Sequence, residues 1–94
     1  MTAELFKQIS AQLLKNCYGL ELADIGFDDD ARIAMFVRAG LRPYMVVSEE
    51  AEDCDLHRID LVGWWGIPSK APLTAKDENL AFAVLQRNSK RADP

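Results

Sequence analysis

Apolar side chains recur at helical spacing in the first part of the chain, with polar side chains between them. Such a stripe is typical of the buried face of a helix. Thr2 can cap the free N–H groups at the start of this helix, and Gly19 has the conformational freedom that a helix end requires. The pattern therefore predicts a helix between these two residues. Its buried face is expected to consist of Leu5, Phe6, Ile9, Leu13, Leu14, Cys17 and Tyr18.

The next segment, residues 20–27, alternates only roughly between apolar and polar side chains, which allows either a short strand or an ordered, packed loop. Three consecutive carboxylates, Asp28–Asp30, then favour a helix start. A carboxylate can cap backbone N–H groups, and further negative charge stabilises the positive end of the helix dipole. Gly40 is expected to end this second helix. Its buried stripe is expected to be Ile33, Phe36 and Val37.

Pro43 opens a third segment and suits the first position of a helix. The signal that follows is divided. Residues 44–47 have strand propensity, whereas the apolar positions from 44 onward repeat at helical spacing and leave a charged face. We predict a helix. Its apolar side is expected to be Tyr44, Val47, Ala51 and Cys54, and its solvated side Glu49, Glu50, Glu52 and Asp53.

The last third of the chain begins with alternation over residues 56–62, which predicts a short strand, followed by a loop with glycine and proline. Thr74 and Asp77 approximate a capping box at the start of a last helix. Its apolar positions are Leu80, Phe82, Val84 and Leu85, and residues 88–94 are expected to be a frayed polar tail. The predicted fold is mainly α (small α+β), with about four helices and a short β element in a single domain, 1–94.

Composition and charge narrow the class of protein. A chain of 94 residues suits one domain, and a net charge of −4 with scattered basic residues argues against a nucleic-acid partner. No apolar run is long enough to span a membrane, and the first residues lack the features of a secretory signal. We therefore expect a cytoplasmic protein. Cys17 and Cys54 are expected to be buried or half-buried thiols in a reducing compartment.

Motifs for catalysis, phosphate binding or cofactor binding are not recognisable in the chain. Its one histidine, His57, has no partner at the short spacing of zinc ligands, so we expect a surface or rim side chain. Asp28–Asp30 lacks the ligand order of a calcium-binding loop. The sequence therefore predicts no catalytic residue, no cofactor and no metal site.

Trp64 and Trp65 stand side by side between two glycines. Neighbouring side chains on extended backbone point to opposite sides, so one indole can lie in the core while the other meets solvent. Exposed tryptophans are frequent anchors of protein interfaces. The alternative, that both indoles pack beneath the loop, stays open because a small domain needs all of its apolar groups.

An ordered set of residues runs through most of the chain. Its strongest stretch is Leu13-Leu14-x-x-x-Tyr18-Gly19-Leu20-x-Leu22-x-Asp24-x-x-Phe27-x-Asp29, and it continues with Ile33, Ala39-Gly40, Val47 and Leu56-x-Arg58-x-Asp60-x-x-Gly63-Trp64. In this order and spacing, the segment from Leu5 to about Asn88 resembles the cytoskeleton-binding toxin family of bacterial type IV toxin–antitoxin systems (CbtA/YeeV-like). The chain departs from the family pattern at Ala23 and Glu49, where the family has an asparagine and an aromatic residue.

The resemblance implies a non-enzymatic inhibitor. It would bind the bacterial tubulin-like division protein, the actin-like cell-shape protein or both, and block their polymerisation. Candidate contacts are Trp64, Trp65, Tyr44 and Glu49. The expected partner is a protein rather than a nucleic acid or a membrane. A weak homodimer is also compatible with this interpretation. Two hypotheses compete with this one: a non-toxic interaction or regulatory protein of a mobile genetic element, itself dimeric, and a small enzyme or ribonuclease-type toxin.

Overall fold

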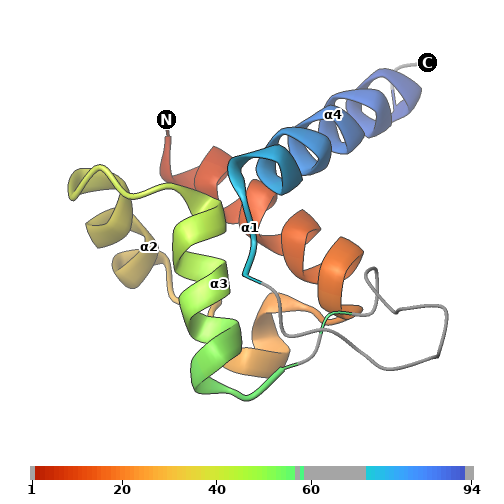
Figure 1. The fold of residues 1–94 in the computed structure, drawn as a ribbon. Helices are drawn as coiled ribbons and strands as arrows, with labels where there is room; N and C mark the ends of the chain where they lie inside the picture. Colours follow the sequence, from red (N-terminus) through yellow and green to blue (C-terminus); the bar gives the residue numbers. More distant parts are fainter. Residues whose placement is uncertain (1, 57, 59–71, 93–94) are drawn as a thin grey trace, which may run out of the picture.

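The computed structural model describes residues 2–56, 58 and 72–92. The elements follow in the order α1 (Ala3–Tyr18), the 3-10 helix η1 (Leu22–Ile25), α2 (Asp30–Arg38), α3 (Pro43–Asp53) and α4 (Ala75–Ala92). Helix α1 contacts α2, α3 and α4, and α3 also contacts α4. Figure 1 shows α2 and α3 together on one side of α1, while α4 leads away from the other helices toward the C-terminus.

Local hydrogen bonds set the helix ends where the sequence predicts them. The Oγ1 atom of Thr2 accepts a hydrogen bond from the N–H of Leu5 at 3.1 Å, and Gly19 ends α1 with a left-handed φ of 69°. Asp29 caps α2 by accepting hydrogen bonds from the first N–H groups of that helix, and Pro43 is the first residue of α3. The predicted starts of these three helices are therefore confirmed.

The sequence allowed or predicted a strand in two segments, residues 20–27 and 56–62, and the structure shows a strand in neither of their described parts. Residues 22–25, within the segment that allowed a strand or a packed loop, form η1, where the N–H of Glu21 donates to Asp24 Oδ2 at 2.8 Å. The short β element expected over residues 56–62 is not seen. In the described part of the chain there is no strand: Leu56 belongs to no regular element, Arg58 is an isolated bridge position, and the other residues of 56–62 lie outside the described residues.

The core lies between α1 and the three helices that contact it. Its fully buried side chains include Phe6, Leu13 and Leu14 from α1, Val47 from α3 and Ala81 from α4. The rings of Phe27 and Phe36 stack with centroids 5.8 Å apart beside this layer. Because every other helix packs on α1, its apolar stripe organises the whole fold.

Helix α4 turns a different face to the core from the one that its apolar residues suggest. Glu78 and Ala81 are buried, whereas Leu80 and Phe82 are 56% and 36% exposed. Residues 78, 81 and 85 share one side of a helix, so the packed face follows this spacing and leaves Leu80 outside. The backbone is helical as far as Ala92, where the sequence predicted a frayed tail from residue 88.

The buried side of α3 is also shifted from the predicted stripe. Val47 and Ala51 are buried as expected, and Val46 joins them, but Cys54 caps the helix end and is exposed. Of the two thiols, only Cys17 is buried. The expectation of a buried or half-buried thiol is therefore wrong for Cys54, because α3 ends one residue before it.

Candidate protein-binding surface along α3

The exposed face of helix α3 is apolar near the start of the helix and acidic toward its end. Near its first turn, Met45 is 46% exposed and lies close in sequence to the exposed Leu41. Toward the other end, the exposed side chains are the carboxylates of Glu49, Glu52 and Asp53. We call this set the α3 face: Met45, Glu49, Glu52 and Asp53. It combines an apolar start with an acidic end, a composition that suits contact with another protein.

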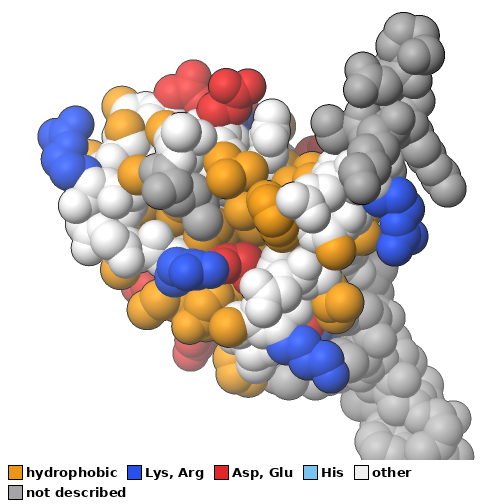
Figure 2. Space-filling view, turned by 90° about the horizontal axis from the view of Figure 1, so that it is seen from above, with side chains coloured by type: hydrophobic (Ala, Val, Ile, Leu, Met, Phe, Trp, Pro, Cys, Tyr) orange, Lys and Arg blue, Asp and Glu red, His pale blue; other side chains and the backbone are white. Residues whose placement is uncertain are grey.

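Hydrophobic side chains also reach the surface near the first turn of α3. Figure 2 looks down on the molecule from the top of Figure 1, where the turn between α2 and α3 and the start of α4 lie. Hydrophobic side chains gather on this side, with Lys and Arg side chains among them. The large exposed hydrophobic residues of the described chain are Met35, Leu41, Met45, Leu80 and Phe82.

Tyr44 and Glu49, the two candidate contacts in the described chain, do not share a face. Five residues along a helix correspond to a rotation of about 140° between the two side chains. Glu49 is exposed on the α3 face, whereas Tyr44 is half-buried and its backbone N–H donates to Glu78 Oε1 at 3.2 Å. The other two candidates, Trp64 and Trp65, lie outside the described residues.

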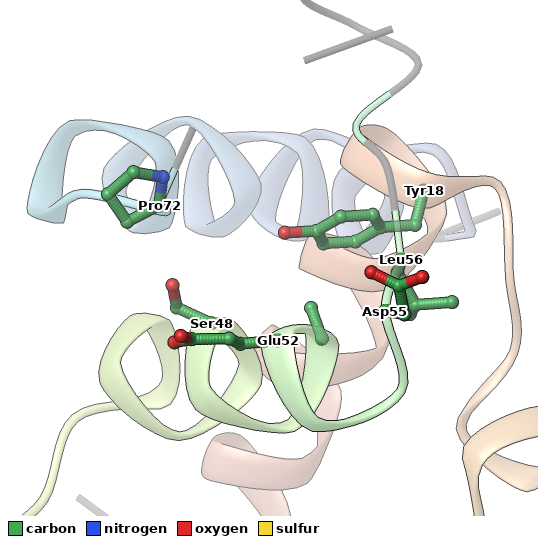
Figure 3. Close-up of a pocket in the computed structure, with 7 residues that line it drawn as sticks. Tyr18, Ser48, Glu52, Asp55, Leu56 and Pro72 are labelled. Atoms are coloured by element: carbon green, nitrogen blue, oxygen red, sulfur yellow. The ribbon is translucent and has the colours of Figure 1, made fainter. Parts of the chain in front are cut away.

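A groove of about 380 Å³ runs beside the second half of α3. It lies between α3, the end of α1 and two short segments that precede and follow the residues not described. Figure 3 shows the Tyr18 side chain reaching into this space from the end of α1, with Ser48 and Glu52 pointing into it from α3. We call this the α3 groove: Tyr18, Ser48, Ala51, Glu52, Asp55, Leu56 and Pro72.

The wall that carries Pro72 is held by a buried arginine. Arg58 is only 2% exposed, and its guanidinium donates to the Pro72 carbonyl oxygen at 3.3 Å and to both carboxylate oxygens of Asp77 at 3.3 Å. On the α3 side, Ser48 Oγ accepts a hydrogen bond from the N–H of Leu73 at 3.2 Å. The charge-assisted hydrogen bonds of Arg58 and the bond between Leu73 and Ser48 together hold the groove in a defined shape.

The pKa of Asp77 reflects this arrangement. Desolvation alone would raise the pKa of the carboxyl, but hydrogen bonds from Thr74 and the charge and hydrogen bonds of Arg58 outweigh it, so the pKa is lowered. The Thr74 N–H donates to Asp77 Oδ2 at 2.9 Å, and the Asp77 N–H donates back to Thr74 Oγ1 at 3.4 Å. The predicted capping box is therefore confirmed, and it also positions the partner of Arg58.

Asp55 enters the groove through an unusual backbone conformation. Its φ of 56° is left-handed, which glycine adopts freely and which Asp and Asn tolerate better than most residues. The Asp55 N–H donates to Glu52 O at 3.1 Å, and the Leu56 N–H donates to Ala51 O at 2.8 Å. This pair of bonds is the Schellman ending of a helix, with Asp where glycine is usual. Because α3 has no glycine at its end, sequence reasoning did not find this turn or the groove beside it.

The charge at this end of α3 is one-sided. Glu52 and Asp55 contribute two carboxylates to the groove, and the last turn of α3 contains no basic residue. The C-terminal end of a helix itself carries partial negative charge. Among the described residues, the end of α3 therefore carries acidic and no basic side chains. Within the described residues, no cluster of three or more His, Cys, Asp or Glu side chains could hold a metal ion.

Comparison with known proteins identifies the class to which this helical domain belongs. Residues 4–79 match the family of the CbtA toxin of type IV toxin–antitoxin systems. The match spans most of the chain, from α1 to the start of α4, so the chain belongs to this toxin family, and every residue of the α3 groove lies within the matched segment. No curated protein and no solved structure matches the chain significantly. Among the described residues, no helix has the length and apolar character needed to cross a membrane.

Proposed function

We propose that this chain is a toxin that binds a subunit of a bacterial cytoskeletal polymer, tubulin-like or actin-like, and blocks its assembly in the cytoplasm. The family match over residues 4–79 carries this proposal. The family is known for binding cytoskeletal proteins and not as a family of enzymes. Inhibition of this kind needs no catalytic group, because a bound domain can prevent the next subunit from docking.

The size of the chain supports such a mechanism. A stable protein complex buries about 800 Å² on each partner, and the chain has an accessible surface of 6183 Å². One side of the domain is therefore sufficient for a specific contact. We place this contact at the α3 face, with Glu49 on it and Tyr44 at its margin, and we keep Trp64 and Trp65 as further candidates.

Induced expression in a bacterial host tests the proposal directly. Growth curves and phase-contrast images should show growth arrest with rounded, lemon-shaped or filamentous cells. The Trp64→Ala plus Trp65→Ala variant, checked for folding by circular dichroism, should lose this effect if the indoles contact the target. Normal growth and morphology with abundant folded protein would contradict the proposal.

Purified components give a second test that does not depend on the host. The tubulin-like and actin-like proteins should each be polymerised with and without the chain, and the polymer should be sedimented. We expect less sedimented polymer for at least one of them, in proportion to the amount of chain added. Unchanged sedimentation of both proteins at a tenfold molar excess of the chain would exclude direct inhibition of assembly.

A non-toxic interaction protein, dimeric in solution, is the second candidate, and helix α4 supports it. Leu80 and Phe82 are exposed on α4 and lie beyond the segment that matches the toxin family. Exposed apolar residues of this size are frequent in protein contacts. Size-exclusion chromatography with light scattering distinguishes the candidates. A dimer that Leu80→Ser plus Phe82→Ser converts to a monomer, together with normal cell morphology, would favour this second candidate.

A further inference from the structure

The turn between α2 and α3 carries apolar side chains on the outside of the molecule. Met35 of α2 is 65% exposed, and Leu41 and Met45 also reach the surface. Two exposed arginines, Arg38 and Arg42, stand between these residues in the sequence. We call this set the turn patch: Met35, Arg38, Leu41, Arg42 and Met45.

Local hydrogen bonds fix the backbone at the centre of the turn patch. The N–H of Leu41 donates to Phe36 O at 3.1 Å, and the N–H of Gly40 donates to Val37 O at 3.0 Å. This pair of bonds is the Schellman ending of a helix, with Gly40 as its left-handed residue at a φ of 76°. In such an ending, the residue after the glycine frequently packs against the helix one turn back. Leu41 is therefore expected beside Met35.

The two helices continue the patch on either side of this turn. Met35 and Arg38 are three positions apart in α2. Arg42 and Met45 are likewise three positions apart where α3 begins. Residues at this spacing lie on the same side of a helix, so each arginine stands beside a methionine. Figure 2 shows this side of the molecule, where hydrophobic side chains gather with Lys and Arg side chains among them.

The turn patch is a basic part of an acidic chain. The charged side chains of residues 31–48 are all basic, namely Arg32, Arg38 and Arg42, whereas the whole chain has a net charge of −4. Arg32 is paired with Glu50 at 3.3 Å, but Arg38 forms no ion pair with a described residue. An anion is therefore favoured at the patch and a further cation is disfavoured.

Arg42 also has hydrogen-bond donors left for a partner. Its Nε and Nη2 atoms donate to one oxygen of Glu78, and a guanidinium has further N–H groups on its second terminal nitrogen. Those of Nη1 have no acceptor among the described residues, and the side chain stays 54% exposed. A carboxylate can bind there while the pair with Glu78 persists, so the contact between α3 and α4 is kept.

Methionines beside arginines suit a protein partner of opposite charge. Methionine is flexible and polarisable, so it adapts to apolar side chains of different shapes. An extended anionic surface, such as a membrane, fits less well. Glu49 lies one turn beyond Met45 on the same exposed side of α3 and would be repelled by such a surface. A short acidic segment can contact the patch without reaching this carboxylate.

We propose that the turn patch binds a short segment of the target protein in which apolar side chains lie beside carboxylates. The apolar side chains pack on the exposed methionines and Leu41, and the carboxylates accept hydrogen bonds from Arg38 and from Nη1 of Arg42. That the segment belongs to the target rests on the proposed function, whereas its chemistry rests on the patch alone. Because Met45 is common to the turn patch and the α3 face, the two form one continuous surface.

A synthetic peptide tests the patch without the target. The probe has about fifteen residues, enough for a helix, with leucine along one side and glutamate at the flanking positions. A control peptide has glutamine at each glutamate position. The ¹⁵N-labelled chain should show saturable shifts of the amide signals of residues 35–45 with the glutamate peptide, at a Kd of about 0.1–1 mM. The glutamine peptide should bind at least roughly threefold more weakly, and added salt should reduce this difference.

Matched variants assign the binding to the turn patch. Arg38→Gln plus Met45→Ser removes one charge and one apolar contact at exposed positions, and it should bind the glutamate peptide at least roughly tenfold more weakly than the wild type. The control, Arg87→Gln plus Leu80→Ser, removes the same kinds of side chain from exposed positions of α4 and should bind like the wild type. Circular dichroism checks that both variants fold. Arg38→Glu should abolish the preference for the glutamate peptide.

Three results with the peptides would each overturn the proposal: equal binding of the two peptides, absence of saturable shifts, and full binding by the Arg38→Gln plus Met45→Ser variant. Vesicles of phosphatidylserine and phosphatidylcholine test the membrane alternative. Binding of the chain to these vesicles that the same variant loses, with no binding of the glutamate peptide, would assign the patch to a membrane and overturn the proposal.

Experiments in cells separate this proposal from the proposed function. The Arg38→Gln plus Met45→Ser variant should lose the growth arrest that the control variant retains. Growth arrest by all variants with no binding of the glutamate peptide would overturn the turn-patch proposal alone. Binding of the peptide with no effect of the wild type on cells would overturn the proposed function alone.

Discussion

The guanidinium of Arg42, the residue that precedes α3, donates through Nε to Glu78 Oε2 at 3.0 Å in the first turn of α4. A second bond from the same guanidinium reaches the same oxygen. The other oxygen of Glu78 accepts the backbone N–H of Tyr44 at 3.2 Å. One carboxylate with a side chain only 3% exposed therefore joins the starts of two helices and satisfies an N–H group that α3 cannot satisfy internally.

Replacing this carboxylate should destabilise the fold. Glu78→Gln keeps the shape and an oxygen for Tyr44 but removes the charge that Arg42 faces, and we expect a loss of about 2 kcal/mol in the free energy of unfolding. Urea unfolding followed by circular dichroism measures this loss. Asn79→Ala, at the next and exposed position of α4, is the control and should change stability by less than about 0.5 kcal/mol. Equal midpoints for the wild type and Glu78→Gln would contradict the assigned role.

The pair of Arg58 and Asp77 predicts a pH dependence of stability. Because the folded state lowers the pKa of Asp77, the unfolded state binds more protons at acidic pH, and stability rises with pH through that range. The contribution is complete above about pH 5, where the aspartate of the unfolded chain is almost fully ionised, and is lost as the pH falls through the lowered pKa. Asp77→Asn should cost about 3 kcal/mol at pH 7, because the buried Arg58 loses the negative charge of this carboxylate.

Thermal unfolding of the wild type and Asp77→Asn between pH 3 and pH 7 measures this dependence. The difference between the two proteins should be largest at pH 7 and should shrink below about pH 4. Exposed Asp28→Asn is the matched control and should run parallel to the wild type. A difference that stays constant over the whole pH range would show that the carboxylate charge does not stabilise the fold.

Two serines on helices predict opposite effects of the same substitution. Ser10 is fully buried in α1, and its hydroxyl has no hydrogen-bond partner among the residues that the structure describes. Ser48 in α3 accepts the N–H of Leu73 at 3.2 Å. Alanine raises helix propensity similarly at both positions. Ser10→Ala should therefore stabilise the protein by about 1 kcal/mol, whereas Ser48→Ala should destabilise it by about 1 kcal/mol. Denaturant unfolding of both variants checks this, and equal shifts would contradict the two assigned environments.

The cysteines predict two rates of thiol labelling. Cys54 is exposed, whereas Cys17 is buried and 3.7 Å from the guanidinium of Arg58. With an excess of a thiol reagent under native conditions, one thiol per chain should react quickly and the second only as fast as the protein opens. Cys54→Ala should remove the fast phase, and Cys17→Ala should leave it. Two fast thiols in the folded wild type would contradict the burial of Cys17.

Local signals in the sequence predicted the helices well. Thr2, Asp29 and Pro43 stand at helix starts, and each acts through its own side chain or ring on the nearest turn of backbone. Gly19 and Gly40 adopt the left-handed φ expected after helices. The end of α3 was harder to predict, because Asp55 takes the position where glycine is usual.

The sequence predicted less well which side of each helix is buried. In α4, Leu80 and Phe82 are exposed while Glu78 is buried, because Arg42 and the Tyr44 N–H come from another helix to meet its carboxylate. A hydrophobic pattern assigns a glutamate to the outside, since the pattern contains no information on a distant partner. The burial of Arg58 has the same cause, because Asp77 neutralises it from 19 positions along the chain.

By itself, the sequence determined that this protein is mainly helical, where most of its helices begin, and the toxin family to which it belongs. These properties depend on neighbouring residues or on residue order, both of which a single chain displays directly. Only the tertiary structure decided which helix faces are buried and that Tyr18, Glu52, Asp55 and Pro72 line one groove. That groove depends on three separate segments meeting in space. Packing on α1 and the ion pairs of Arg42 with Glu78 and of Arg58 with Asp77 bring them together, not any local pattern.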